Sequence, residues 1–224
     1  MVFVKKIEIW LLGIAAIFFS FSLFLDKPKP EFNANKVAPP IEIQYLSAGM
    51  LSQVSDSFWL RAIQDIEYCE KMVGQGVCEG KSWFFNVINL VVELDKQFIE
   101  AYYFGGLSLT VFINDVPGAS IIFDKGVSIF KYEWPLLYLA AYHALFQEKD
   151  KLKASKLYLR AGENGAPPWV RLSAGKLAAQ GGDEQAAVEI LEQLIRVEAD
   201  PSWIKKMQEQ LAEIKKKNPP SESK

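Results

Sequence analysis

The 224-residue chain has few side chains that carry out acid–base, redox or metal chemistry, and they do not form a motif. His143 is the only histidine, which excludes a site built from several histidine ligands and leaves one candidate base for a nucleophile. It stands in the largely apolar stretch LAAYHALF, where we interpret it as a packed histidine rather than a catalytic one. The acidic residues Asp65, Glu67 and Glu70 are typical of a solvated helix face.

The remaining composition also argues against chemistry. The glycine pairs at 105–106 and 181–182 are not followed by the Lys-Ser/Thr of a phosphate-binding loop. A net charge of −2 gives no basic surface for nucleic acid. The sequence therefore predicts a protein that is not an enzyme, with no catalytic, cofactor-binding or metal-binding residues and no small-molecule substrate. An enzyme or a receptor for a small ligand stays open as a weaker alternative.

The two cysteines, Cys69 and Cys78, lack the spacing of redox or zinc motifs. They flank the glycine-containing stretch CEKMVGQGVC, in which a turn could bring them together as a disulfide in an oxidising compartment. Two independent thiols in a reducing cytosol are the alternative.

An uncharged run at 9–25, IWLLGIAAIFFSFSLFL, follows two lysines near the start of the chain. As a helix it would rise about 25 Å, close to the lower limit for crossing a bilayer. No small-residue cleavage site follows it, so a retained signal-anchor is favoured over a cleaved signal peptide. We therefore expect a transmembrane helix within 1–25 in the bacterial inner membrane. The basic residues do not decide its orientation, and the cysteines favour a periplasmic body.

Beyond this run, the sequence predicts a proline-rich extended linker over 26–46 and then helices. From residue 47 onward, apolar residues recur at steps of three and four, and sustained alternation is lacking, except in the short IEIQY at 41–45. We therefore expect an all-α protein.

A repeat organises the helical part. The aromatic markers Phe98, Trp134, Trp169 and Trp203 follow one another at intervals of 36, 35 and 34 along the chain, and each is predicted to open a helix that is followed by a turn and a second helix. The second helices share a stripe of a small, a large and a small or medium residue at i, i+4 and i+7. These stripes are Ala119, Phe123 and Gly126; Ala154, Tyr158 and Ala161; and Ala187, Leu191 and Leu194.

Glycine and proline mark the boundaries between repeats. In GENGAPPW (162–169), Gly162 or Gly165 can end a helix in a left-handed conformation, and Pro167 and Pro168 suit the start of the next helix. The segment DPSW (200–203) repeats this pattern one interval later, with Asp200 as a candidate N-cap.

The chain resembles the tetratricopeptide repeat (TPR) family over about 49–217. The resemblance lies in the repeat interval of about 34 residues, the small-x3-aromatic-x2-small pattern and the proline before a new repeat. It implies a right-handed α-solenoid of about four helical hairpins. The last segment has apolar residues on one stripe and charge elsewhere, which suits a capping helix with a polar outer face, and we expect a disordered tail at 218–224. The hairpins are expected at 49–95, 98–131, 134–162 and 168–198, within a repeat domain over 47–217, and the terminal helix at 201–217.

In the TPR family, the first helix of each hairpin lines a concave groove that binds protein partners. On that basis Arg61, Gln64, Tyr102, Tyr138 and Tyr142 are candidate partner-binding residues. The sequence thus predicts a membrane-tethered scaffold or assembly factor that docks a protein, such as a subunit of a membrane-associated envelope complex. A chaperone-like partner of the protein-export machinery is the alternative.

Overall fold

The computed structural model describes residue 14, residues 39–66, residue 78 and residues 80–217, and these residues form helices without strands. The chain divides into two compact units, Met1–Lys36 and Val37–Lys224, and all elements below belong to the second. They are η1 (Ile41–Leu46), α2 (Leu51–Gln64), α4 (Trp83–Leu94), α5 (Ile99–Ser108), η2 (Leu109–Ile113), α6 (Val116–Ile129), α7 (Trp134–His143), η3 (Ala144–Glu148), α8 (Lys151–Glu163), α9 (Pro168–Gln180), α10 (Glu184–Val197) and α11 (Pro201–Lys217).

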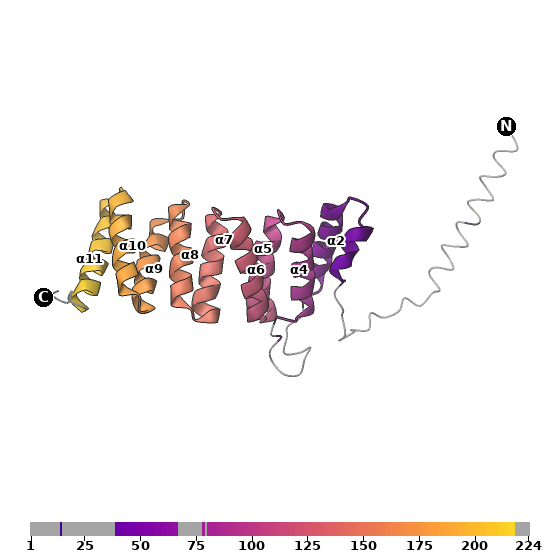
Figure 1. The fold of residues 1–224 in the computed structure, drawn as a ribbon, viewed down its shortest axis with the longest axis horizontal. Helices are drawn as coiled ribbons and strands as arrows, with labels where there is room; N and C mark the ends of the chain where they lie inside the picture. The colour runs from indigo at the N-terminus through magenta and orange to yellow at the C-terminus, as the bar shows by residue number, and fades with distance from the viewer. Residues whose placement is uncertain (1–13, 15–38, 67–77, 79, 218–224) are drawn as a thin grey trace, which may run out of the picture. The chain divides into compact units, whose positions relative to one another are not determined.

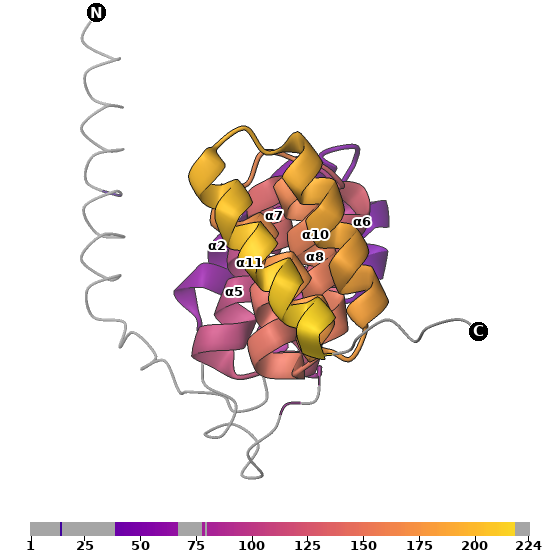
Figure 2. The same cartoon turned by 90° about the vertical axis from the view of Figure 1, so that its left-hand side faces the viewer.

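Consecutive helices of the second unit pack side by side in chain order, from α2 to α11 (Figure 1). The hairpins are α2/α4, α5–η2/α6, α7–η3/α8 and α9/α10, and α11 packs on the last of them. We call the first helix of each hairpin, together with α11, the A helices, and the second the B helices. Viewed along the row, A helices α5 and α11 lie on one side and B helices α6 and α10 on the other (Figure 2). The described residues thus form an all-α helical-repeat array, an α-solenoid, as the sequence predicts.

Two predictions about the N-terminal region need correction. Among the described residues, no helix is both long and apolar enough to cross a membrane. This finding overturns the transmembrane part of the predicted fold class, which is withdrawn; apart from Ile14, the segment 1–38 on which it rested lies outside the described residues. The predicted extended linker is also wrong at its end, because residues 41–46 form the 3₁₀ helix η1, which begins after Pro40 and packs against α4. The predicted tail at 218–224 lies outside the described residues too.

Each B helix begins at a polar N-cap side chain. Ser82 accepts a hydrogen bond from the Phe85 amide, and Asp115, Asp150 and Asp183 accept one from the amide three residues onward. Such caps satisfy backbone donors that have no partner within the helix. The four cap residues recur at intervals of 33, 35 and 33. They therefore mark the start of each B helix, as the aromatic markers mark the start of each later A helix.

Two A helices end in the same way. In α5–η2 and α7–η3, a π-helical turn is closed by a residue in the left-handed region, Asn114 at φ 62° and Lys149 at φ 61°. In α9 a glycine takes this place, Gly182 at φ 91°, where the absence of a Cβ removes the steric cost. The aspartate cap of the next helix follows directly in all three hairpins.

Small residues in the middle of the A helices allow close packing. A Cβ on Gly106 would lie 2.7 Å from the ring of Phe123, and one on Gly175 would lie 2.6 Å from Leu191. Phe123 and Leu191 are the large members of the B-helix stripes, so the predicted i, i+4, i+7 pattern marks where the two helices of a hairpin meet. All nine stripe residues are buried, which confirms that the stripes face the core.

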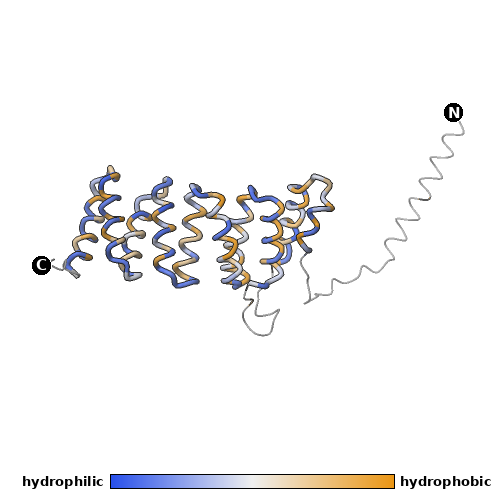
Figure 3. Tube along the Cα trace, in the orientation of Figure 1, coloured by the Kyte–Doolittle hydropathy of each residue, from blue (hydrophilic) through white to orange (hydrophobic). Residues whose placement is uncertain are grey.

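The segment 162–169 is a boundary between hairpins, as predicted, and the structure selects among its residues. Gly165 adopts the left-handed conformation, φ 93°, whereas Gly162 lies inside α8, where a Cβ would be 2.6 Å from the Arg171 side chain. Pro167 is the N-cap residue of α9, and Pro168 is its first residue. The array ends with α11, in which Met207 is buried and polar and charged residues make up most of the rest. The contrast with the hydrophobic α4 is visible in Figure 3.

Candidate partner-binding surface

A hollow of about 530 Å³ opens between the A helices of the third and fourth hairpins. We call it the tyrosine hollow. Its lining consists of Tyr138, Tyr142, Leu145, Phe146, Tyr158, Ser173, Lys176, Leu177 and Gln180. All of these residues except Tyr158, which lies on α8, belong to the A helices α7–η3 and α9. The size of the hollow falls within the range of protein pockets that bind small ligands, about 300–1,000 Å³.

Aromatic rings form the walls of the tyrosine hollow. The rings of Tyr142 and Phe146, one helical turn apart, have centroids separated by 4.5 Å. Tyr138 contacts Tyr158 at 5.6 Å and meets Trp169 edge-on at 5.5 Å. Both geometries are favourable for aromatic pairs. The rings therefore fix one another, and the wall is largely formed before any partner arrives.

The rings of the tyrosine hollow differ in exposure: a buried ring forms its floor and two exposed rings form its rim. Tyr158 is buried, and that burial raises the pKa of its hydroxyl, so the group stays neutral at physiological pH. Tyr142 and Phe146 are 42% and 46% exposed. Other large apolar side chains of the array are as exposed, such as Phe104 and Phe112, but Tyr142 and Phe146 also border a hollow, which makes this rim a candidate contact surface.

One charged side chain lines the tyrosine hollow: Lys176, which is exposed on α9. Within the described part of the chain, no carboxylate forms an ion pair with its amine. The other polar lining groups are the hydroxyl of Ser173, the amide of Gln180 and the tyrosine hydroxyls, all of which are neutral. The hollow is therefore apolar at its walls and positive at one edge.

A second hollow, of about 200 Å³, adjoins the first and shares Lys176 and Gln180 with it. It lies between α9, α10 and α11, and its other lining residues are Ala179, Glu184, Gln210, Glu213 and Ile214. Two of them are acidic. The A-helix surface thus changes from aromatic to polar toward α11, with Lys176 at the junction.

Of the five predicted partner-binding residues, Tyr138 and Tyr142 both line the tyrosine hollow. Arg61 and Gln64 are exposed on α2, outside both hollows, and Arg61 pairs with Asp65 at 3.2 Å. The prediction for Tyr102 needs correction because this residue is only 1% exposed. Its ring packs edge-on against Phe130 at the end of α6 and its hydroxyl donates to the Lys96 carbonyl before α5, so its side chain is fixed inside the array and is not available to a partner.

Sequence reasoning missed Phe146, Lys176 and Gln180, although the repeat contained the signal for all three. Phe146 follows Tyr142 by four positions, which places it on the same helix face. Lys176 and Gln180 follow Tyr142 and Phe146 by one repeat interval, which places them on the equivalent face of the next A helix. Taking the i+4 neighbour of Tyr142 and then extending both positions by one period would have found them.

His143 lies away from this surface and is only 2% exposed, between the second and third hairpins. Its Nδ1 is 2.9 Å from the Thr110 hydroxyl and its Nε2 is 2.9 Å from the Ser120 hydroxyl. Burial lowers its pKa from 6.5, against the opposing effect of Glu148 at 3.8 Å. The residue therefore joins helices through hydrogen bonds, which agrees with its interpretation as a packed histidine.

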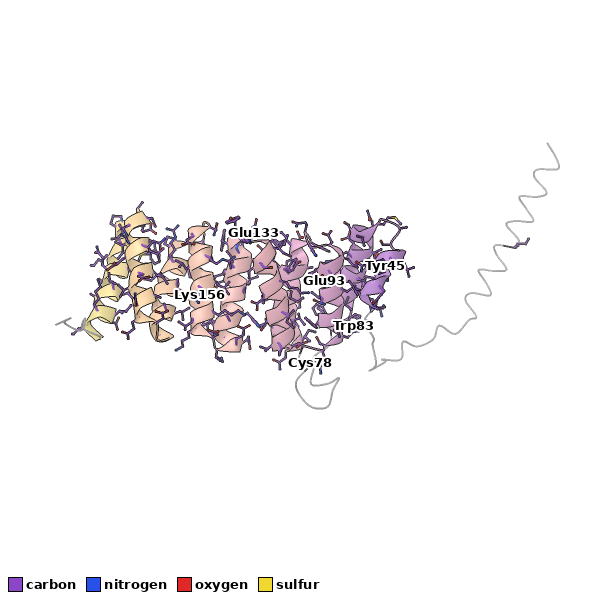
Figure 4. All side chains as sticks on the ribbon, in the orientation of Figure 1. Tyr45, Cys78, Trp83, Glu93, Glu133 and Lys156 are labelled. Atoms are coloured by element: carbon purple, nitrogen blue, oxygen red, sulfur yellow. The ribbon has the colours of Figure 1, made fainter. Side chains whose placement is uncertain are left out.

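Cys78 is buried and disulfide-bonded, close to the start of α4 (Figure 4). Its predicted partner, Cys69, lies outside the described residues, so the Cys69–Cys78 pairing stays a prediction.

Comparison with known proteins adds no family to this description. No protein-family model matches the chain, and a search of curated proteins finds no significant similarity. The class of protein is therefore defined by its fold and surface: an α-solenoid with an aromatic hollow on its A-helix side.

Proposed function

We propose that this protein is a scaffold or assembly factor, which binds a partner protein through the A-helix surface around the tyrosine hollow. The observation that carries the proposal is the half-exposed pair Tyr142 and Phe146 at the rim of a preformed aromatic hollow. Tyrosine is enriched among the residues that dominate binding energy at protein interfaces, because it offers a large rigid contact area with a polar tip.

The array itself supports a binding role. Stacked helical hairpins give an extended surface whose side chains can vary without disturbing the core, and such arrays commonly serve as interaction modules. The repeat period and the boundary prolines make a TPR-type array our proposed family. We also propose an oxidising location such as the periplasm, supported by the disulfide at Cys78, since disulfides persist in oxidising compartments.

Site-specific photo-crosslinking in the native cell tests the proposal. A photoreactive phenylalanine analogue replaces Phe146 on the A side, and the matched control places it at Lys156, an exposed position on B helix α8 (Figure 4). We expect a discrete crosslinked protein with the Phe146 probe and none with the Lys156 probe. Equal products from both positions, or none from either, would refute partner binding at this surface.

The pattern of products also separates the two predicted roles. One stable product, present in a stoichiometric complex in mild detergent, supports the scaffold. Many transient products of newly exported chains would instead support the chaperone-like alternative. No feature of the described residues specifically favours that alternative.

A further inference from the structure

We propose that the tyrosine hollow binds a partner segment in which a large apolar side chain adjoins an acidic one. This inference rests on the proposed function and names the chemistry of the partner. The apolar side chain packs against the rings of Tyr142, Phe146 and Tyr158, and the carboxylate meets Lys176 at the edge.

The apolar half of the motif follows from the walls. The lining combines four aromatic rings with Leu145 and Leu177, so most of its surface is apolar and favours an apolar side chain. A leucine or an aromatic side chain instead buries its own surface together with the exposed parts of Tyr142 and Phe146. Because these two rings already contact each other at 4.5 Å, little ordering is needed when the side chain binds.

The acidic half follows from charge. Lys176 is the single charged side chain in the lining of the tyrosine hollow, and among the described residues it forms no ion pair with a carboxylate. Aromatic walls alone would also accept a cation through its attraction to the ring faces, but Lys176 repels one. The apolar anchor therefore fits the rings, and a carboxylate beside it fits the positive charge of Lys176.

The second hollow limits how far the acidic character of the partner can extend. Glu184 and Glu213 line it beyond Lys176, so a further acidic residue on that side would face like charges. The expected segment is therefore an apolar anchor beside one acidic position, not a long acidic run.

Selection from a display library of short random peptides tests the inference without a known partner. The full chain and its Lys176→Glu variant are screened in parallel, and Lys156→Glu, with the same charge change on α8, is the control. We expect the native chain and the control to enrich peptides that place Leu, Phe or Trp beside Asp or Glu. The Lys176→Glu variant should lose the acidic preference and keep the apolar one.

An enriched peptide then gives a quantitative test by fluorescence anisotropy. Replacing its acidic residue by the amide is expected to weaken binding about fivefold on the native chain, as for a partly exposed ion pair, and to have little effect on Lys176→Glu. Phe146→Ala should weaken binding of both peptides. Thermal unfolding checks that each variant is folded.

Three results would overturn the inference: no enrichment, enrichment without acidic residues, or the same acidic preference on the Lys176→Glu variant. They leave the proposed function intact if the Phe146 probe still crosslinks a discrete protein in cells. Loss of that crosslink, in contrast, refutes the proposed function itself.

Discussion

Replacing Asp115 by alanine is expected to destabilise the array far more than the same change at Asp150 or Asp183, although all three cap a B helix. The hydrogen bonds of Asp150 and Asp183 are exposed to solvent. Each carboxylate accepts one bond from the amide three residues onward, at 2.8 Å for Asp150 and 2.9 Å for Asp183. Losing such a cap typically costs about 1 kcal/mol.

Asp115 differs because it is fully buried and also joins two hairpins. Besides the Gly118 amide at 3.2 Å, it accepts hydrogen bonds from the Gly80 amide at 2.7 Å, the Ser82 amide at 3.2 Å and the Ser82 hydroxyl at 2.5 Å. In the alanine variant the hydroxyl can rotate to another acceptor, but the two additional amides lose their partner. At about 1–2 kcal/mol for each stranded amide, added to about 1 kcal/mol for the cap, the expected loss is about 3–5 kcal/mol.

Urea unfolding of the full chain, followed by circular dichroism, measures these differences from the midpoints and slopes. Hydrogen exchange locates the loss, which is expected in the amides of α4 and α6, the helices that Asp115 joins. Asp115→Asn should fall between wild type and alanine, because it keeps one acceptor oxygen and turns the other into a donor. If Asp115→Ala costs no more than Asp150→Ala, the idea that the interhairpin bonds dominate is refuted.

Three further predictions concern packing, pH and the disulfide. Gly175→Ala should destabilise the array by about 1–3 kcal/mol, since the new Cβ would lie 2.6 Å from Leu191; an unchanged melting temperature would contradict the close approach of α9 and α10. Because the pKa of His143 is lowered from 6.5 on folding, the unfolded chain binds its proton more readily, and the free energy of unfolding should fall as the pH drops below about 6.5. Urea midpoints on either side of this pH measure the loss, which should shrink in His143→Gln; equal pH dependence in both proteins would rule it out. Reduction should lower stability by about 2–3 kcal/mol for a short loop, with Cys78→Ser insensitive to the reductant, and peptide mapping of the oxidised chain should recover Cys69 linked to Cys78.

The helical-repeat character could be read from the sequence because it depends on local spacing. Proline and glycine restrict the backbone wherever they stand, so the boundary at 162–169 was visible from residue types alone. The i, i+4, i+7 stripes marked the buried face of each B helix for the same reason, since helix geometry places those residues on one side. The recurring N-caps from Ser82 to Asp183 carried an equally local signal that the aromatic markers overshadowed.

The register between helices was less certain, because it depends on which small residue meets which large one. Sequence spacing alone aligns Gly105 with Ala141 and Lys176. The contacts of Gly106 with Phe123 and of Gly175 with Leu191 instead make Gly106 and Gly175 equivalent, one residue later in the second hairpin and one residue earlier in the fourth. A shift of one residue turns a helix by about 100°. The register therefore decides whether a side chain such as Lys176 faces the core or the surface.

What the sequence determined by itself was the class of elements, their period and the positions of their boundaries, all of which follow from backbone restrictions and local helix geometry. What only the tertiary structure decided was which tyrosines face outward. Tyr102 and Tyr142 both lie on A helices among apolar neighbours, yet Tyr102 is enclosed, with its ring against Phe130 at the end of α6, and Tyr142 remains 42% exposed beside Phe146. Exposure depends on how neighbouring hairpins pack, and residues from three helices brought together in space, not adjacent in the chain, create the tyrosine hollow.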